Sequence, residues 1–122
     1  MTKVIDKTMD RIDVKSKKID TFGDILDALH STEDKKKLLW KEIYENALTD
    51  RENAYTLFTD LLQQAKGNSA NHAMFGSIMA KYLERMSKSN DQILRLAELI
   101  AKSSEEEDSI NSDEIFDKIT ED

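Results

Sequence analysis

The chain has 122 residues, of which 39% are apolar and 35% charged, with a formal net charge of −7. This length fits one small domain, and the absence of cysteine excludes a disulfide framework and thiol chemistry. No run of about 18 apolar residues occurs and the charged start MTKVIDKTMDRIDVK lacks a signal-peptide core, so we expect a cytoplasmic protein without membrane contact.

The chain contains no proline and only three glycines, and its middle is rich in Ala, Leu, Lys, Glu, Ile and Met. This composition favours an all-α fold. The acidity is concentrated at the end, because residues 103–122 hold nine acidic residues and one basic residue, while residues 1–102 hold 16 acidic and 17 basic residues. We therefore interpret residues 103–122 as an acidic interaction tail.

Residues 1–30 are predicted to form an N-terminal arm. Apolar residues occur at helical spacing before residue 20, but charges interrupt every turn and no cap is present. From Thr21, a candidate N-cap, the stretch TFGDILDALH predicts a short amphipathic helix. Its apolar face consists of Phe22, Ile25, Leu26 and Leu29.

A long helix is predicted to begin at Ser31, because Ser31 and Asp34 have capping-box spacing. Apolar or small residues then follow with alternating steps of four and three, which is a heptad seam. The seam consists of Trp40, Tyr44, Ala47, Arg51, Ala54, Phe58, Leu61 and Ala65. Arg51 interrupts it, so we expect this side chain to face a carboxylate of the next helix (Glu84, Asp91 or Glu98) or a water-filled channel.

The stretch AKGNSANHAMFGSIM predicts a corner between two helices. Gly67 stands where a helix C-terminus requires a left-handed residue, and Asn68 or Ser69 is a candidate N-cap. Gly76 is expected to permit close helix approach. The next seam consists of Phe75, Met79, Tyr82, Met86, Ser89, Ile93, Leu96 and Ile100. Residues 31–102 are thus predicted to form a long, coiled-coil-like antiparallel hairpin of helices about 50 Å long.

Each long helix also has a second apolar stripe beside its seam. These stripes contain Leu48, Tyr55 and Leu62 in the first helix, and Ile78, Leu83, Leu94 and Leu99 in the second. A lone hairpin cannot bury both stripes, so we expect self-association. Beyond Lys102, a flexible linker SSEEEDS and a short acidic amphipathic helix are predicted, the latter with Ile110, Ile115, Phe116 and Ile119.

The sequence offers little material for catalysis. His30 and His72 are distant in the chain without further metal-ligand spacing, and no phosphate-binding glycine loop occurs. Carboxylates such as Glu42 and Glu45 are expected on a solvated helix face. Trp40 with Tyr44 is interpreted as core rather than as a base-stacking pair. We expect no catalytic residues, no metal and no cofactor.

The segment AKGNSANHAMFGSIMAKYLERMSKSNDQILRLAELI resembles the central helical hairpin of the small terminase subunits of contractile-tailed bacteriophages. The matching motifs are the helix opening MFGSIMAKYL and the ending NDQILRL, residues 90–96. Upstream, DRENAYTLFTDLLQQAK, residues 50–66, is similar to the family's first helix. The resemblance covers about residues 40–102.

The resemblance implies a viral DNA-packaging regulator that is not an enzyme. Such proteins form rings through the hairpin, engage double-stranded viral DNA in the host cytoplasm and regulate a large subunit that holds the ATPase and nuclease. The expected oligomerisation residues are Tyr55, Phe58, Leu62, Phe75, Met79, Tyr82, Met86, Ile93 and Leu96.

Charge and pattern suggest where the partners bind. DNA contact is assigned to Lys35, Lys36, Lys37 and Lys41, with Lys15, Lys17 and Lys18 as alternatives. Docking of the large subunit is assigned to Ile115, Phe116 and Ile119. Because the acidic tail competes for the basic residues, DNA binding is expected to be weak and strongly salt-dependent.

Two other functions remain open from the residues alone. One is a dimeric helical-hairpin adaptor that binds a protein partner through its acidic tail and does not bind DNA. The other is an enzyme, which the scarcity of catalytic side chains disfavours. A discrete oligomer larger than a dimer and salt-dependent DNA binding would distinguish the packaging regulator from the adaptor.

Overall fold

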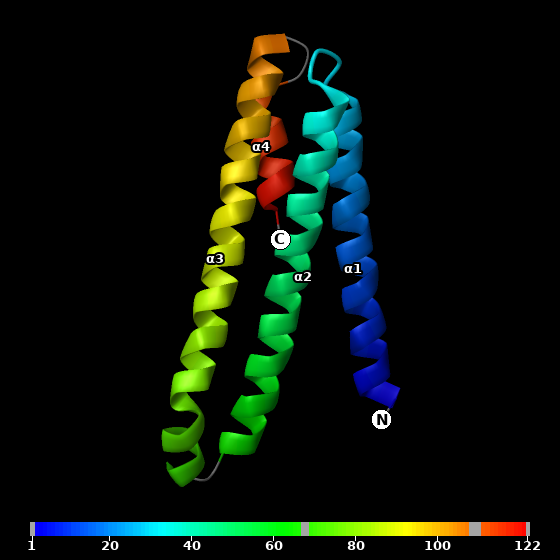
Figure 1. The fold of residues 1–122 in the computed structure, drawn as a ribbon. Coiled ribbons are helices and arrows are strands. Elements are labelled where there is room, and N and C mark those ends of the chain that lie inside the picture. The colour runs from blue at the N-terminus through cyan, green and yellow to red at the C-terminus, as the bar shows by residue number, and fades with distance from the viewer. Residues whose placement is uncertain (1, 67–68, 108–110, 122) are drawn as a thin grey trace. The chain divides into compact units, whose positions relative to one another are not determined.

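The computed structural model describes residues 2–66, 69–107 and 111–121, with side chains at 9–66, 73–106 and 111–121. Within these ranges it contains helices and no strand, which confirms the all-α prediction (Figure 1). The helices are α1 (Thr2–Asp27), α2 (Asp34–Ala65), α3 (Ser69–Glu107) and α4 (Ser112–Thr120).

The chain divides into two compact units. Unit 1 comprises residues 1–45 and 93–122, and unit 2 comprises residues 46–92. The predicted segments 1–30, 31–102 and 103–122 therefore do not coincide with the structural units. The reason is that α2 and α3 are long enough to contribute one part to each unit.

The ends of the helices differ from the predicted ends in three places. The arm is helical from Thr2, whereas the sequence predicted a start at Thr21. Helix α2 begins at Asp34, and the carbonyl of Glu33 accepts backbone hydrogen bonds from Lys36 at 3.0 Å and Lys37 at 3.2 Å. Helix α3 continues to Glu107, so residues 103–107 of the predicted flexible linker are helical.

The core of unit 1 takes side chains from all four helices. The predicted apolar face of the arm is buried: Phe22 is 1% exposed and Leu29 is fully buried. The Phe22 ring stacks on Tyr44 of α2, with centroids 4.1 Å apart and ring planes 7° from parallel. The remaining buried apolar residues of this core are Ile25, Leu26, Ile93, Leu96, Ala97, Ile100, Ile115 and Ile119.

The N-terminal part of α1 has a different character. Met9, Ile12 and Val14 are each more than half exposed, so burial of these three side chains contributes little to holding the helix. Its helical state follows from good helix formers without proline and from continuity with the anchored turns at Phe22 to Leu26. The sequence pattern before residue 20 was weak for this reason.

Unit 2 buries small residues and exposes large ones. Among its described side chains, the buried apolar residues are Ala47, Leu48, Ala54 and Ala65. The larger seam residues Phe58, Phe75, Met79, Tyr82 and Met86 are half-buried. Tyr55, Leu57, Leu62, Met74, Ile78 and Leu83 are 40% to 66% exposed. Two helical segments alone therefore leave a considerable part of the area of these six side chains in water.

The predicted corner lies partly outside the described residues. Gly67, Asn68 and the side chains of Ser69 and His72 fall outside them, so the proposed caps are not tested. Gly76 is exposed in α3, and a Cβ placed there would meet nothing within 4 Å. The prediction that Gly76 permits close helix approach is thus wrong within this chain.

Candidate functional site

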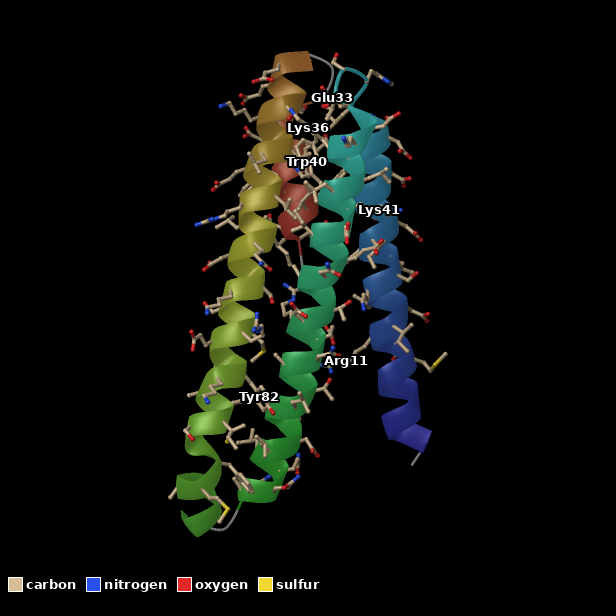
Figure 2. All side chains as sticks on the ribbon, viewed as in Figure 1. Arg11, Glu33, Lys36, Trp40, Lys41 and Tyr82 are labelled. Carbon is tan, nitrogen blue, oxygen red and sulfur yellow. The ribbon has the colours of Figure 1, made fainter. Side chains whose placement is uncertain are left out.

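The lysines at the start of α2 do not form a one-sided patch. Lys35, Lys36 and Lys37 are consecutive, so their side chains leave the helix about 100° apart. Lys37 is half-buried, and Lys35 and Lys36 are exposed. Figure 2 shows Lys36 and Lys41 on α2, and the ammonium of Lys41 lies 4.0 Å from the position a Cβ would take at Gly23 of α1. Their assignment to DNA binding remains a prediction.

The alternative lysines lie on α1, where two of them border a pocket. Lys17 and Lys18 line it together with Val14 and Thr21 of the same helix. Tyr44 of α2 and Lys118 and Glu121 of α4 complete the lining, and the volume is about 200 Å³. We call this the α1–α4 pocket. Lys15 is half-buried and is not part of the lining.

A second pocket of about 350 Å³ adjoins the first, because Thr21, Lys118 and Glu121 line both. Its remaining lining residues are Asp24, Ile25, Ala28, Glu114 and Ile115. The charges along the seam between α1 and α4 are therefore separated. Lys17 and Lys18 lie at one end, the carboxylates of Asp24 and Glu114 lie at the other, and Lys118 lies between them.

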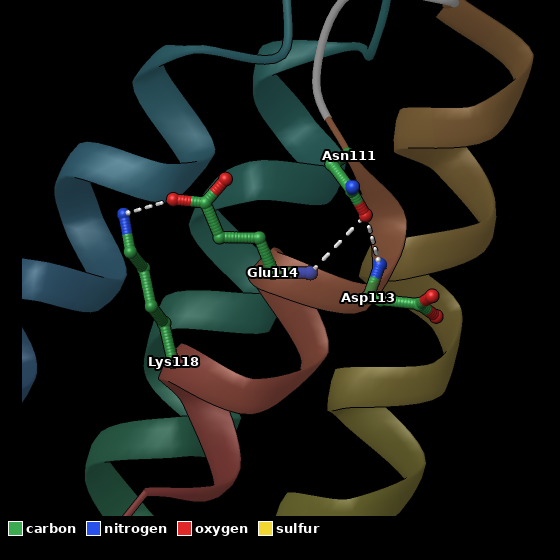
Figure 3. A network of polar contacts seen from close by, with 4 residues as sticks. All are labelled: Asn111, Asp113, Glu114 and Lys118. Atoms are coloured by element: carbon green, nitrogen blue, oxygen red, sulfur yellow. Dashed lines mark hydrogen bonds and ion pairs between the residues drawn. The ribbon is translucent and has the colours of Figure 1, made fainter.

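Helix α4 is held in place by its own polar contacts (Figure 3). The side-chain oxygen of Asn111 accepts hydrogen bonds from the backbone N–H groups of Asp113, at 2.9 Å, and Glu114, at 3.4 Å. One turn later Lys118 Nζ lies 3.2 Å from Glu114 Oε1. The Ser112 hydroxyl donates to Glu105 Oε1 of α3 at 2.9 Å, which joins the two helices.

The apolar face of α4 is covered by the chain itself. Ile115 is 2% exposed and Ile119 is 3% exposed, and α4 packs against α1. Phe116 is half-buried. The structure thus confirms a short helix in the tail, but the residues assigned to docking of the large subunit are occupied within the chain. A partner reaches Ile115 and Ile119 only after α4 is released.

Arg51 has an amide as its partner and not one of the predicted carboxylates. Its Nη1 donates a hydrogen bond to Asn90 Oδ1 at 2.9 Å. This contact joins α2 to α3 within unit 2 and is exposed to solvent. The cationic side chain at a seam position therefore remains hydrated, so no buried charge has to be neutralised.

Unit 2 also contains a pocket of about 440 Å³ between its two helical segments. From α2 it is lined by Asp50, Asn53, Ala54 and Leu57, and from α3 by Lys81, Tyr82 and Arg85. Sequence reasoning missed this pocket because its lining combines the seam residues Ala54 and Tyr82 with residues beside the seam and has no motif of its own. The only signal was that Leu57 lies off the seam.

The described part of the chain contains neither a candidate metal site nor a candidate membrane-spanning helix. Among those residues, no group of three His, Cys, Asp or Glu side chains is placed to hold a metal ion. In the same residues, no helix carries an apolar stretch long enough to cross a bilayer.

Tyr44, which the sequence assigned to the core, is 3% exposed, whereas Trp40 is half-buried.

Comparison with protein-family models, with curated proteins and with solved structures found no match to this chain.

Proposed function

We propose that this protein is a DNA-packaging regulator of the small-terminase type that assembles into a ring through α2 and α3, engages double-stranded DNA and regulates an ATPase/nuclease subunit without being an enzyme itself. The observation that carries the proposal is the exposure of large apolar side chains on unit 2. The resemblance of residues 40–102 to the small-terminase hairpin and the all-helical fold support it further.

The exposed apolar residues of unit 2 lie on two different faces. Tyr55 and Leu57 are two residues apart in α2, so their side chains leave the helix about 200° apart. The same holds for Leu83 and Arg85 in α3. Leu57 and Arg85 line the same pocket, so they belong to one face, which we call the pocket face. Ile78 lies on this face as well, because it precedes Arg85 by two helical turns.

The opposite face is marked by the hydrogen bond between Arg51 and Asn90, and we call it the bridge face. Tyr55 follows Arg51 by one turn of α2, and Leu83 precedes Asn90 by two turns of α3. Tyr55 is 43% exposed and Leu83 is 50% exposed. When a chain has apolar surfaces on two opposite faces, one face of each copy can bind the other face of the next copy. Such head-to-tail contacts close into a ring when the rotation between neighbouring copies brings the last copy back to the first.

Paired variants test this arrangement. Leu57→Lys/Ile78→Lys places charge on the pocket face, and Tyr55→Lys/Leu83→Lys places charge on the bridge face. All four side chains are at least 40% exposed, so helix content is expected to be unchanged. Native mass spectrometry of the wild type should give a discrete oligomer larger than a dimer. Each variant alone should be monomeric, and an equimolar mixture should form a 1:1 dimer from the two intact faces.

The control is Gln63→Lys, which adds a lysine at an exposed position of α2 outside both faces and should leave the oligomer intact. A wild type that is monomeric at tens of micromolar contradicts the ring. Variants that each dimerise alone contradict head-to-tail assembly and favour the dimeric adaptor. DNA engagement is tested separately by titrating duplex DNA at low and moderate salt, where salt-independent binding or no binding contradicts it.

A further inference from the structure

The α1–α4 pocket gathers positive charge without a motif in the sequence. Three of its lining residues are lysines, namely Lys17, Lys18 and Lys118, and they come from helices that are about 100 residues apart in the chain. Glu121 is the single carboxylate in the lining. The formal charge around the pocket is therefore +2, whereas the whole chain carries −7.

The two lysines of α1 are available to a ligand. Among the described residues, neither Lys17 nor Lys18 has a hydrogen-bond or ion-pair partner. Lys118 is held by Glu114 at 3.2 Å, which orients its ammonium along α4. The Thr21 hydroxyl supplies a polar group at the side of the pocket. Tyr44 forms a rigid wall because its ring is stacked on Phe22 and is 3% exposed.

The lining of the α1–α4 pocket carries a formal charge of +2, and like charges gathered in one place repel one another. An anion with two or more charges removes this repulsion and binds the helices together. The carboxylates of Asp24 and Glu114 lie in the adjoining pocket, which confines the anion to the end formed by Lys17 and Lys18.

We propose that the α1–α4 pocket binds a phosphate group, and that the bound phosphate holds α4 against α1. This site does not depend on ring assembly or on the proposed packaging function. The ligand chemistry is that of a phosphate with at least two negative charges, either a free phosphate compound or the backbone of a nucleic acid.

Hydrogen exchange of the full chain tests the site, with inorganic pyrophosphate as the probe and sodium chloride at matched ionic strength as the reference. We expect pyrophosphate to slow exchange in the α4 segment, residues 111–121, in a saturable manner. Lys17→Gln/Lys18→Gln should weaken pyrophosphate binding by roughly tenfold or more, because charge-assisted hydrogen bonds are lost. Both lysines are outside the buried core, so circular dichroism should show unchanged helix content.

The matched control is Lys66→Gln/Lys102→Gln, which removes the same charge from two exposed positions, one just after α2 and one in α3, that have no assigned role in binding. This variant should bind pyrophosphate like the wild type. Equal losses in both variants, or protection of α4 by chloride as strong as by pyrophosphate, would overturn the site. A parallel arm with duplex DNA identifies the source: protection of α4 by DNA that depends on Lys17 and Lys18 supports a backbone phosphate, and protection by pyrophosphate alone supports a free one.

Discussion

Asn111 stands immediately before the first residue of α4 and has an extended backbone, with φ −64° and ψ 117°. In this conformation its side-chain oxygen reaches the N–H groups of Asp113 and Glu114, which have no partner inside the helix. The acidic residues of this first turn also suit the positive end of the helix dipole. One residue therefore fixes where a helix of only nine residues begins.

Replacing Asn111 by Ala should weaken α4 by about 1 kcal/mol, because two backbone donors lose their acceptor. The effect should appear as several-fold faster hydrogen exchange in residues 111–121, with exchange in α2 unchanged. Asn111→Asp is the matched control, since it keeps an acceptor at the same position. If Ala and Asp variants exchange alike, the cap does not stabilise α4.

At Arg51 and Gly76 the prediction from the sequence differs from the structure, because the neighbouring helices do not cover these positions as the pattern implied. The heptad pattern predicts that Arg51 is buried. The neighbouring seam residues are alanines, however, and only two helical segments pack here, so the guanidinium remains in water beside Asn90. Gly76 was predicted to be a helix-contact residue, but a Cβ placed there would meet nothing within 4 Å among the described residues. Which side of a helix is covered depends on its neighbours, and a one-dimensional pattern does not specify them.

Helix α4 is the element whose stability depends most on docking. Nine residues form a marginal helix in water, so its helical state requires the burial of Ile115 and Ile119 together with its caps. Burying one such side chain contributes about 1.5–3 kcal/mol, and the whole docked state of α4 is therefore stable by only a few kcal/mol. A partner with a comparable apolar helix has enough free energy to displace it.

The substitution Ile115→Asp should release α4 while leaving the long helices folded, because a carboxylate in the apolar contact is costly to bury. Hydrogen exchange should become fast in residues 111–121 and remain slow in the buried part of α3 around Ile93 and Ile100. Asp117→Ala, an exposed position on the same helix, is the control and should change little. Loss of protection throughout α3 would mean that α4 is part of one cooperative core with it.

At the scale of the whole molecule, the two units differ in what they bury. Unit 1 has a core built from four helices with large side chains such as Phe22 and Ile100, whereas the buried apolar residues described in unit 2 are mainly alanines. Unit 1 therefore gains much more from burial of apolar area than unit 2 does. This difference is why the assembly proposal rests on unit 2.

The acidic tail provides a prediction at this scale. Residues 103–107 belong to α3, and Ser104 is fully buried, so a deletion should begin at residue 108 to leave α3 intact. Residues 108–122 hold six acidic residues and one lysine. Their removal should increase the affinity for duplex DNA at low salt. The gain over the full-length chain should become smaller as the salt concentration rises, because salt screens the charges of the tail. Fluorescence anisotropy at two salt concentrations measures this, and an unchanged affinity contradicts competition by the tail.

The sequence by itself determined the all-helical class, the two long helices, the buried face from Phe22 to Leu29 and the amphipathic helix of the tail, because these depend on local propensity and on a 3.6-residue period. Only the tertiary structure decided that α4 covers its own apolar face, that Arg51 meets an amide, and that Lys17 and Lys18 share a pocket with Lys118. These features join residues distant in the chain, and their contacts follow from how helices pack, which periodicity does not encode.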